Sequence, residues 1–190
     1  MKVGLFFGSF NPVHNGHLII ANYILEHSEL NQIWMVLSPQ NPFKQNQHLL
    51  NEYHRLYLMQ LAIEGEQHIK AVDIEFGLPK PSYTINTLAY LEEKYPSYEF
   101  SIIMGSDSLQ NIKKWKSGDL ILKRYCIYVY DRPGFELNGQ LENENIISTK
   151  APLLEISSSM LRKMIKEKKS IRYYVPDSVN EEVLKAGYYK

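Results

Sequence analysis

Short, continuously apolar runs alternate with longer amphipathic segments along the 190 residues of the chain. The apolar runs span residues 3–7, 33–37, 100–104 and 125–130. Because these runs are continuous rather than alternating, they are typical of parallel strands that helices cover on both faces. One more strand is expected near residues 146–147.

Helical periodicity fills the intervals between these runs. Helices are predicted over residues 18–26, which are apolar almost all round, and over residues 52–63 and 84–95, where apolar side chains recur at helical spacing. The resulting β-α-β-α order predicts an α/β fold with a doubly wound, mostly parallel sheet and right-handed crossovers.

The C-terminal part, about residues 151–190, is predicted to be a small helical subdomain. A helix is expected over residues 158–167. A second helix is expected to begin at Ser178, because Ser178 and Glu181 have the spacing of a capping box, and to end near Gly187.

Composition adds three expectations. The 21 basic and 21 acidic residues give no net charge that would attract nucleic acid or an anionic membrane. No repeat or linker divides the sequence, so we expect a single domain over residues 1–190. Cys126 is the one cysteine, and no apolar run reaches the ~18 residues of a membrane helix, so a cytoplasmic protein is expected. The sequence leaves open whether the chain forms a homo-oligomer.

The stretch GSFNPVHNGH, residues 8–17, joins the first apolar run to the first predicted helix. Gly8 has no Cβ and lets the backbone approach a phosphate closely, while the N–H groups at the helix start favour negative charge. His14 and His17 flank a pair of residues suited to a tight turn. Both imidazoles are therefore expected to donate N–H bonds to one phosphoryl group.

Two alternatives remain for this stretch. Asn-Pro and Asn-Gly are common turn dipeptides, so the loop alone carries little weight. The two histidines would also suit a metal ion, but zinc takes three or four protein ligands, and no further cysteine or close histidine pair is offered.

A second candidate phosphate site is the stretch EISSSMLRKMI, residues 155–165. Serine hydroxyls, the N–H groups of a helix start and the guanidinium of Arg162 would face one anion. Serines before a helix are also ordinary N-caps, and that alternative stays open here.

The candidate acceptor site combines two further stretches, residues 81–88 and 105–115. Asp107 follows an apolar run, where its carboxylate would accept hydrogen bonds from ribose hydroxyls or cap the short helix after it. Trp115 would stack on a flat heteroaromatic ring or cover the core.

These motifs resemble those of a known family. GSFNPVHNGH matches the signature G-S/T-F-D/N-P-x-H-x-G-H of nucleotidyltransferases with a Rossmann-like fold, and the landmarks from Gly8 to Arg162 resemble bacterial nicotinate-nucleotide adenylyltransferases. The resemblance implies transfer of the adenylyl group of ATP to nicotinate mononucleotide, with release of pyrophosphate. It also implies Mg²⁺ that is held by the ATP phosphates rather than by a protein metal site.

The resemblance further implies the roles of individual residues. His14, His17 and Arg162 would be catalytic. ATP would contact Gly8, Ser9, Phe10, His14, His17, Ser157, Ser158, Ser159 and Arg162. The acceptor nucleotide would contact Lys44, Tyr83, Thr84, Ile85, Gly105, Asp107, Trp115 and Lys116. Trp115 would stack on the nicotinate ring, and main-chain N–H groups at residues 83–85 and 115–116 would hold its carboxylate. Phe43 replaces a histidine of the family beside Lys44.

Other functions share parts of these motifs. Preference for nicotinamide mononucleotide is the nearest one. Phosphopantetheine adenylyltransferases have threonine at the position of His14 and shorter chains, and class I aminoacyl-tRNA synthetases carry a KMSKS motif that this chain lacks. A sensor that binds ATP without transfer is the non-enzymatic alternative.

Overall fold

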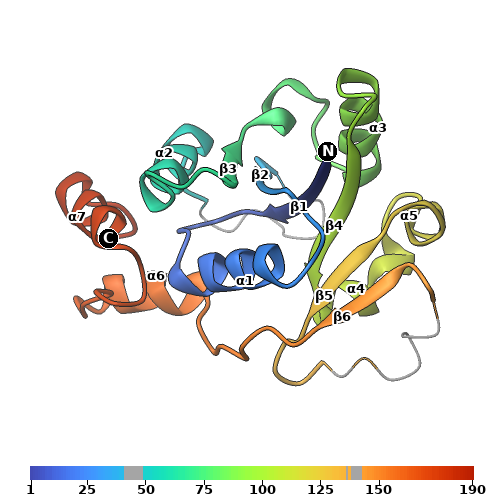
Figure 1. The fold of residues 1–190 in the computed structure, drawn as a ribbon. Coiled ribbons are helices and arrows are strands. Elements are labelled where there is room, and N and C mark those ends of the chain that lie inside the picture. Colours follow the sequence, from blue (N-terminus) through green and yellow to red (C-terminus); the bar gives the residue numbers. More distant parts are fainter. Residues whose placement is uncertain (41–48, 136, 138–142) are drawn as a thin grey trace.

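Six parallel strands form one sheet in the computed structural model, which describes residues 1–40, 49–135, 137 and 143–190. The strands are β1 (Lys2–Gly8), β2 (Gln32–Leu37), β3 (Ile69–Val72), β4 (Glu99–Gly105), β5 (Ile127–Tyr130) and β6 (Ile146–Thr149). Their order in the sheet is β3-β2-β1-β4-β5-β6 (Figure 1). This is the strand order of doubly wound dinucleotide-binding folds, and it confirms the predicted fold class.

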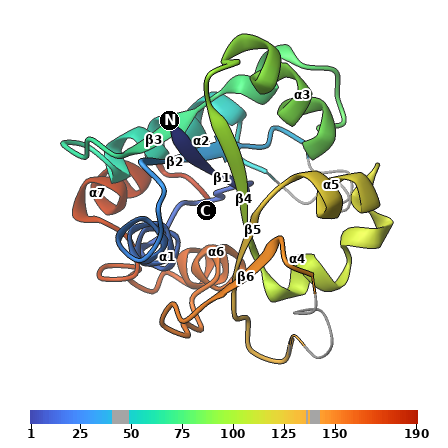
Figure 2. The same cartoon turned by 45° about the vertical axis from the view of Figure 1, so that its right-hand side comes forward.

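The helices cover both faces of the sheet. They are α1 (Asn15–Glu26), α2 (Glu52–Ala62), α3 (Thr84–Lys94), α4 (Ser106–Gln110), α5 (Gly118–Arg124), α6 (Ser158–Lys166) and α7 (Asp177–Ala186), with 3-10 turns η1 (Ile74–Gly77) and η2 (Ile112–Lys114). One face packs against α1, α2, α6 and α7, and the other against α3, α4 and α5 (Figures 1 and 2). No helix in the described part of the chain combines the length and apolar character needed to cross a bilayer.

Two apolar cores explain why the elements pack in this way. On one face, Ile24 of α1 and Leu58 of α2 are buried against sheet residues such as Met35. On the other face, Leu88 and Leu91 of α3 are fully buried against the sheet. Each fully buried side chain of this size stabilises the fold by about 1.5–3 kcal/mol, so the apolar stripes of the helices fix their places.

The start of α7 differs from the prediction. The N-cap is Pro176, and the helix begins at Asp177, so the expected capping box of Ser178 and Glu181 is absent at the helix start. The hydroxyl of Ser178 instead donates a hydrogen bond to the carbonyl of Leu61, 3.0 Å away, which ties α7 to the end of α2. The end of the helix at Gly187 agrees with the prediction, since Gly187 has a φ of 68°.

The strand β3 has no counterpart in the apolar runs. Its sequence is Ile-Lys-Ala-Val, it lies at one edge of the sheet, and Lys70 is exposed. An edge strand is covered less completely than a central one, so its sequence need not be continuously apolar.

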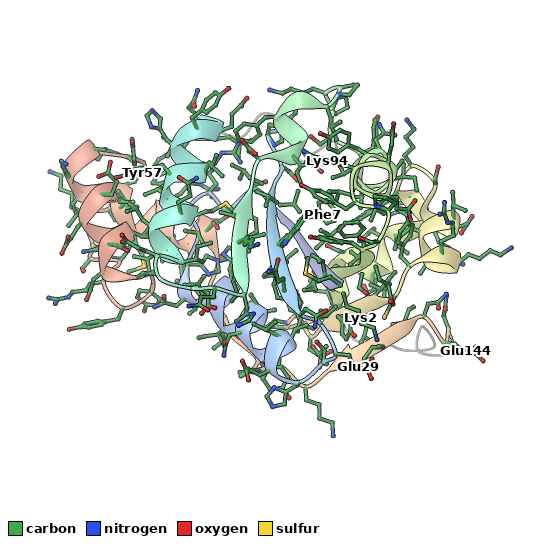
Figure 3. The ribbon with its side chains drawn as sticks, turned by 45° about the horizontal axis from the view of Figure 1, so that its top comes forward. Lys2, Phe7, Glu29, Tyr57, Lys94 and Glu144 are labelled. Carbon is green, nitrogen blue, oxygen red and sulfur yellow. The ribbon has the colours of Figure 1, made fainter. Side chains whose placement is uncertain are left out.

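The strand order also fixes where a ligand can bind. β1 and β4 are neighbours in the sheet, yet the chain leaves them toward opposite faces, α1 on one side and α4 on the other. Ligands bind at such a switch point, outside the carboxyl ends of the strands. The opposite end of β1 carries a structural ion pair between Lys2 and Glu29, which lie close together in Figure 3.

Candidate active site

A cavity of about 460 Å³ lies at this switch point. The segments that contribute to its wall include the loop after β1, the connection before α3, the segment after β4, the end of β5 and the start of α6. The wall includes Gly8, Ser9, Phe10, His14, His17, Tyr83, Thr84, Gly105, Asp107, Trp115, Lys116, Ser157, Ser158, Ser159 and Arg162. Of the predicted site residues, Ile85 does not line the cavity, and Lys44 lies outside the described residues.

Phe10 organises the loop after β1. Its backbone adopts a left-handed conformation with a φ of 42°, which is unusual for a bulky residue and marks a locally strained site. Its buried ring stands edge-on to the imidazole of His17 at 4.9 Å between centroids. A Cβ on Gly8 would lie 2.8 Å from the same ring, so Gly8 is required by the packing of Phe10 as well as by any approach of a ligand.

His14 and His17 belong to the start of α1. His14 is the N-cap and His17 the third residue of the helix, so Asn15 and Gly16 form its first turn rather than the separate tight turn that the sequence suggested. The two rings stack at 3.7 Å between centroids. A Cβ on Gly16 would lie 3.0 Å from Nδ1 of His14, which explains why glycine stands between them.

A hydrogen bond of His17 and the burial of His14 determine which protons the two rings carry. Nδ1 of His17 accepts a hydrogen bond from the backbone N–H of His14 at 3.3 Å, so a neutral His17 carries its proton on Nε2. His14 is only 5% exposed. Burial, followed by the positive charge of Arg132, lowers the pKa of His14 to about 4, so this imidazole is neutral at pH 7.

The start of α6 is fastened directly to the loop after β1. The hydroxyl of Ser158 donates to the carbonyl of Pro12 at 2.8 Å, and the guanidinium of Arg162 donates to the carbonyl of Asn11 at 2.8 Å. Both acceptors are neutral, so Arg162 keeps its full charge for an anion. The two predicted phosphate-binding segments therefore lie side by side.

The three serines before α6 differ in their contacts. Ser157 is an N-cap whose hydroxyl accepts from the N–H of Met160 at 3.2 Å, which confirms the ordinary capping interpretation for this serine. Ser159 accepts a hydrogen bond from Arg162 at 3.3 Å. All three serines nevertheless line the cavity.

The start of α3 contributes Tyr83 and Thr84 to the cavity wall. The N-cap is Tyr83, without a side-chain hydrogen bond, and the helix begins at Thr84. The N–H groups of Thr84 and Ile85 belong to the first turn of the helix, where the helix itself offers no acceptor. The side chain of Ile85 packs in the core, which leaves its main chain as the part relevant to a ligand.

The segment after β4 contributes Asp107, Trp115 and Lys116 to the cavity wall. Asp107 is the second residue of α4, whose N-cap is Gly105 without a side-chain bond, so the capping alternative for Asp107 is wrong. Trp115 packs on the core, which confirms that alternative, and it also lines the cavity, where its stacking on a ring stays a prediction. Nζ of Lys116 lies 4.8 Å above the centre of the Tyr83 ring and connects this segment to the start of α3.

Sequence reasoning missed two charged residues in the cavity wall, Arg132 and Glu75. Arg132 follows the end of β5 by two residues, and its Nε lies 3.8 Å from the carboxylate of Asp107. Glu75 follows the end of β3 by three residues. The rule that ligands bind at the carboxyl ends of parallel strands would have singled out both positions.

Arg55 of α2 is a third missed residue, and it is bonded to the loop after β1 that lines the cavity. Its side chain is only 1% exposed. Its guanidinium donates to the carbonyls of Ser9 at 2.7 Å, Leu50 at 2.8 Å, Ser38 at 3.0 Å and Pro39 at 3.2 Å. Arg55 thereby holds the loop after β1 to the segment after β2. These partners are far apart in the sequence, so the sequence alone does not indicate the contact.

Metal-binding side chains do not gather in the described part of the chain. Among those residues, no three histidine, cysteine, aspartate or glutamate side chains lie close enough together to hold a metal ion. Among the described residues, His14 and His17 therefore have no third protein ligand of the kind that a zinc site requires.

Comparisons with known proteins agree with this geometry. The family model described as Cytidylyltransferase-like matches residues 5–164. A probable nicotinate-nucleotide adenylyltransferase of Cytophaga hutchinsonii is 49% identical, with 100% of this chain and 98% of the relative covered. The corresponding protein of Flavobacterium psychrophilum is 48% identical, with 100% of both covered.

A solved structure has the same fold. It is the Plasmodium falciparum nicotinic acid mononucleotide adenylyltransferase complexed with NaAD, with a TM-score of 0.85, 21% identity, and 99% of this chain and 97% of that chain covered. At this identity the match concerns the fold alone. The identity of the bacterial relatives extends over the whole chain. The chain therefore belongs to the cytidylyltransferase-like family and, within it, to the nicotinate-nucleotide adenylyltransferases.

Proposed function

We propose that the protein transfers the adenylyl group of ATP to nicotinate mononucleotide, which gives nicotinate adenine dinucleotide and pyrophosphate. The observation that supports this function best is the direct attachment of the α6 start to the loop after β1, through Ser158 and Arg162. This attachment builds one anion-binding wall, and Tyr83, Thr84 and Trp115 stand in the same cavity. The cavity thus offers a triphosphate site and an acceptor site side by side.

The reaction is an in-line displacement at the α-phosphorus of ATP. A phosphate oxygen of the mononucleotide forms the new P–O bond, and the bond to the β-phosphate bridging oxygen breaks, so that pyrophosphate leaves with the electron pair. The attacking phosphate is already an anion at neutral pH, so no general base is required. Positioning of the two substrates and stabilisation of charge are the main tasks of the protein.

His17 and Arg162 are proposed to stabilise the phosphate charge directly. Because Nδ1 of His17 accepts from the backbone N–H of His14, the proton of the neutral ring sits on Nε2, which makes this nitrogen the donor. Arg162 supplies a fixed positive charge, and the first N–H groups of α6 add the favourable end of the helix dipole. His14 contributes as a neutral donor, since burial lowers its pKa to about 4.

We propose that Mg²⁺ enters as part of the Mg·ATP substrate. Mg²⁺ in nucleotide enzymes is commonly held by one or two carboxylates together with substrate phosphates, and the described residues contain no larger ligand group. Asp107 is a carboxylate of the cavity wall that suits such a role. When bound, the ion neutralises charge that develops on the leaving pyrophosphate.

The acceptor end is proposed to recognise a carboxylate. The N–H groups of Thr84 and Ile85 lie in the first turn of α3, where the helix itself offers no acceptor. The N–H of Lys116 is proposed to join them, whereas that of Trp115 already donates to the carbonyl of Ile112 at 2.9 Å. Such a set pairs with both oxygens of a nicotinate carboxylate but not with the NH₂ of a nicotinamide, which predicts a preference for the acid. Trp115 is proposed to stack on the pyridine ring.

A pyrophosphate-release assay tests the function. Purified protein with ATP and Mg²⁺ is offered nicotinate mononucleotide, nicotinamide mononucleotide and phosphopantetheine in parallel. We expect the acid to have the highest kcat/KM. Preference for the amide would assign the sister activity, and ATP binding without pyrophosphate release from any acceptor would indicate a sensor.

We also propose that the enzyme acts in the cytoplasm, without nucleic acid or a membrane as partner. Support comes from its balanced charge, with 21 basic and 21 acidic residues, and from Cys126, which has no second cysteine to pair with.

A further inference from the structure

Glu75 is a buried carboxyl group in the wall of the cavity to which the proposed reaction assigns no role. It lies in the 3-10 turn η1, shortly after the carboxyl end of β3, and is only 1% exposed. Its Oε1 accepts a hydrogen bond from the hydroxyl of Thr87 at 2.9 Å. Its Oε2 is buried and has no hydrogen-bond partner in the described part of the chain.

The partner of Glu75 belongs to the first turn of α3. The backbone N–H of Thr87 bonds to the carbonyl of Tyr83 at 3.3 Å, and its hydroxyl lies 3.5 Å from the same oxygen. The Thr87 hydroxyl thus donates to Glu75 at the shorter distance and to the Tyr83 carbonyl at the longer one, which ties the carboxyl group of Glu75 to the start of α3. The turn held in this way carries the N–H groups of Thr84 and Ile85.

A carboxyl group at this position lowers the stability of the fold. Burial raises the pKa of Glu75, and the hydroxyls of Thr87, Ser38 and Ser82 counteract only part of that shift. A buried oxygen without a partner costs stability, and an apolar side chain of similar size would avoid this cost. Stability alone does not account for Glu75, whereas a role in the site does.

We propose that Glu75 is a positioning residue for the acceptor nucleotide. By holding Thr87, it fixes the first turn of α3 and thereby the N–H groups of Thr84 and Ile85 that receive the carboxylate of the acceptor. The inference rests on the proposed function, and it deepens that function by naming what sets the geometry of the carboxylate site.

Two substitutions of Glu75 test the proposal. Glu75→Leu removes the acceptor for Thr87, and we expect the KM for nicotinate mononucleotide to rise about tenfold, as one lost hydrogen bond in the site would cause. The KM for ATP is expected to stay within about twofold, because the ATP phosphates bind at the other end of the cavity. Glu75→Gln keeps an oxygen that accepts from Thr87, so it is expected to hold the acceptor KM within about threefold of the wild-type value.

The stability of the variants distinguishes positioning from a structural role. Because Glu75 is buried with an unpartnered oxygen, we expect the Tm of Glu75→Leu to equal or exceed that of the wild type. A purely structural role would lower the Tm and would raise both KM values together.

A variant of the partner and a matched control complete the design. Thr87→Val removes the donor of the same bond, so the double variant with Glu75→Leu is expected to be no worse than Glu75→Leu alone. Glu92 is a matched control, because it lies on α3, the helix of Thr87, and also accepts a hydrogen bond from a hydroxyl, that of Tyr125 at 2.8 Å. Glu92 is not part of the cavity wall. Glu92→Leu is expected to leave both KM values unchanged.

The outcomes separate this inference from the proposed function. If the wild type releases pyrophosphate with nicotinate mononucleotide but Glu75→Leu keeps the wild-type acceptor KM, the positioning role is wrong and the function stands. Equal rises of both KM values with a lower Tm would also overturn the positioning role. If the wild type itself is inactive with every acceptor, the proposed function is wrong.

Discussion

The imidazole rings of His14 and His17 are stacked, with 3.7 Å between their centroids and 24° between their planes. Nδ1 of His17 accepts from the backbone N–H of His14, so the two residues hold each other at the start of α1. This arrangement fixes both the position of the His17 ring and the nitrogen that carries its proton. A donor fixed before the substrate arrives stabilises developing charge without reorganisation during the reaction.

Replacement of His17 tests which nitrogen contacts the substrate. We expect His17→Ala to lower kcat by roughly 10²–10³, the effect of losing one donor to a developing negative charge. His17→Gln places an amide N–H near the position of Nε2, whereas His17→Asn places it near Nδ1. Steady-state pyrophosphate release is therefore expected to be faster for the glutamine variant. Wild-type kcat in His17→Ala would refute the assignment.

The burial of His14 makes the stability of the protein depend on pH. The pKa of His14 is lowered from its ordinary value of 6.5 to about 4, first by burial and then by Arg132. Between these values the unfolded chain binds more protons than the folded chain, so the contribution is complete above pH 6.5 and is lost as the pH falls toward 4. We expect the free energy of unfolding to fall by about 2 kcal/mol between pH 7 and pH 5, measured by urea denaturation.

His14→Gln provides the control for this measurement. The variant lacks the titrating group, so its free energy of unfolding should change less between pH 7 and pH 5 than that of the wild type. An identical pH dependence in both proteins would show that another group causes it.

Gly16 is expected to tolerate no side chain. A Cβ at this position would lie 3.0 Å from Nδ1 and 3.1 Å from Cε1 of His14, so the ring must shift. We expect Gly16→Ala to lower kcat at least about tenfold, because displacements of less than 1 Å in a site have effects of this size. Gly77→Ala serves as a control, since nothing lies within 4 Å of its added Cβ. Equal kcat values for the two variants would contradict the prediction.

Arg162 combines a charge with a fixed geometry, and two substitutions separate these properties. Arg162→Ala is expected to lower kcat/KM for ATP by about 10–100-fold, since a hydrogen bond to a charged group contributes about 1.5–3 kcal/mol. Arg162→Lys keeps the charge but loses the planar fork that bonds to Asn11 and Ser159, so an intermediate value is expected. If Arg162→Lys is as active as the wild type, the charge at this position is sufficient and the planar geometry is not required.

Arg55 is expected to determine the stability of the site. Arg55→Met removes the donor from four carbonyl groups, of which those of Ser38 and Pro39 are buried and the other two half-buried. We expect a loss of at least about 3 kcal/mol in the free energy of unfolding. Arg124 is a suitable comparison, because its ion pair with Glu92 is largely exposed. Arg124→Met should cost less than about 1 kcal/mol, and a similar loss in both variants would refute the special role of Arg55.

The central part of the fold could be predicted from the sequence because its signals are local. The runs at β1, β2 and β4 are continuously apolar, and the helices α1, α2 and α3 lie within three residues of their predicted bounds. β3 was missed because an edge strand needs less apolar cover. The capping box at Ser178 was wrong because the carbonyl of Leu61, far away in the sequence, takes its hydroxyl.

The candidate site shows the same difference between signals that are local in the sequence and contacts between distant segments. The motif at residues 8–17 and Arg162 were found because their residues are informative in sequence order, and the structure places both in one cavity. Glu75, Arg55 and Arg132 were missed because each acquires its meaning from partners in other segments. A lone charged residue in a sequence does not reveal whether the folded chain will bury it.

The bond between Ser158 and Pro12 joins residues 146 positions apart. During synthesis on the ribosome, the loop after β1 emerges well before α6, so the bonds between them can form only later. A nascent chain that stops before α6 lacks half of the wall that would receive the triphosphate. On the proposed function, ATP would bind and stabilise only chains that already contain α6. Cellular ATP would therefore stabilise these chains over truncated ones.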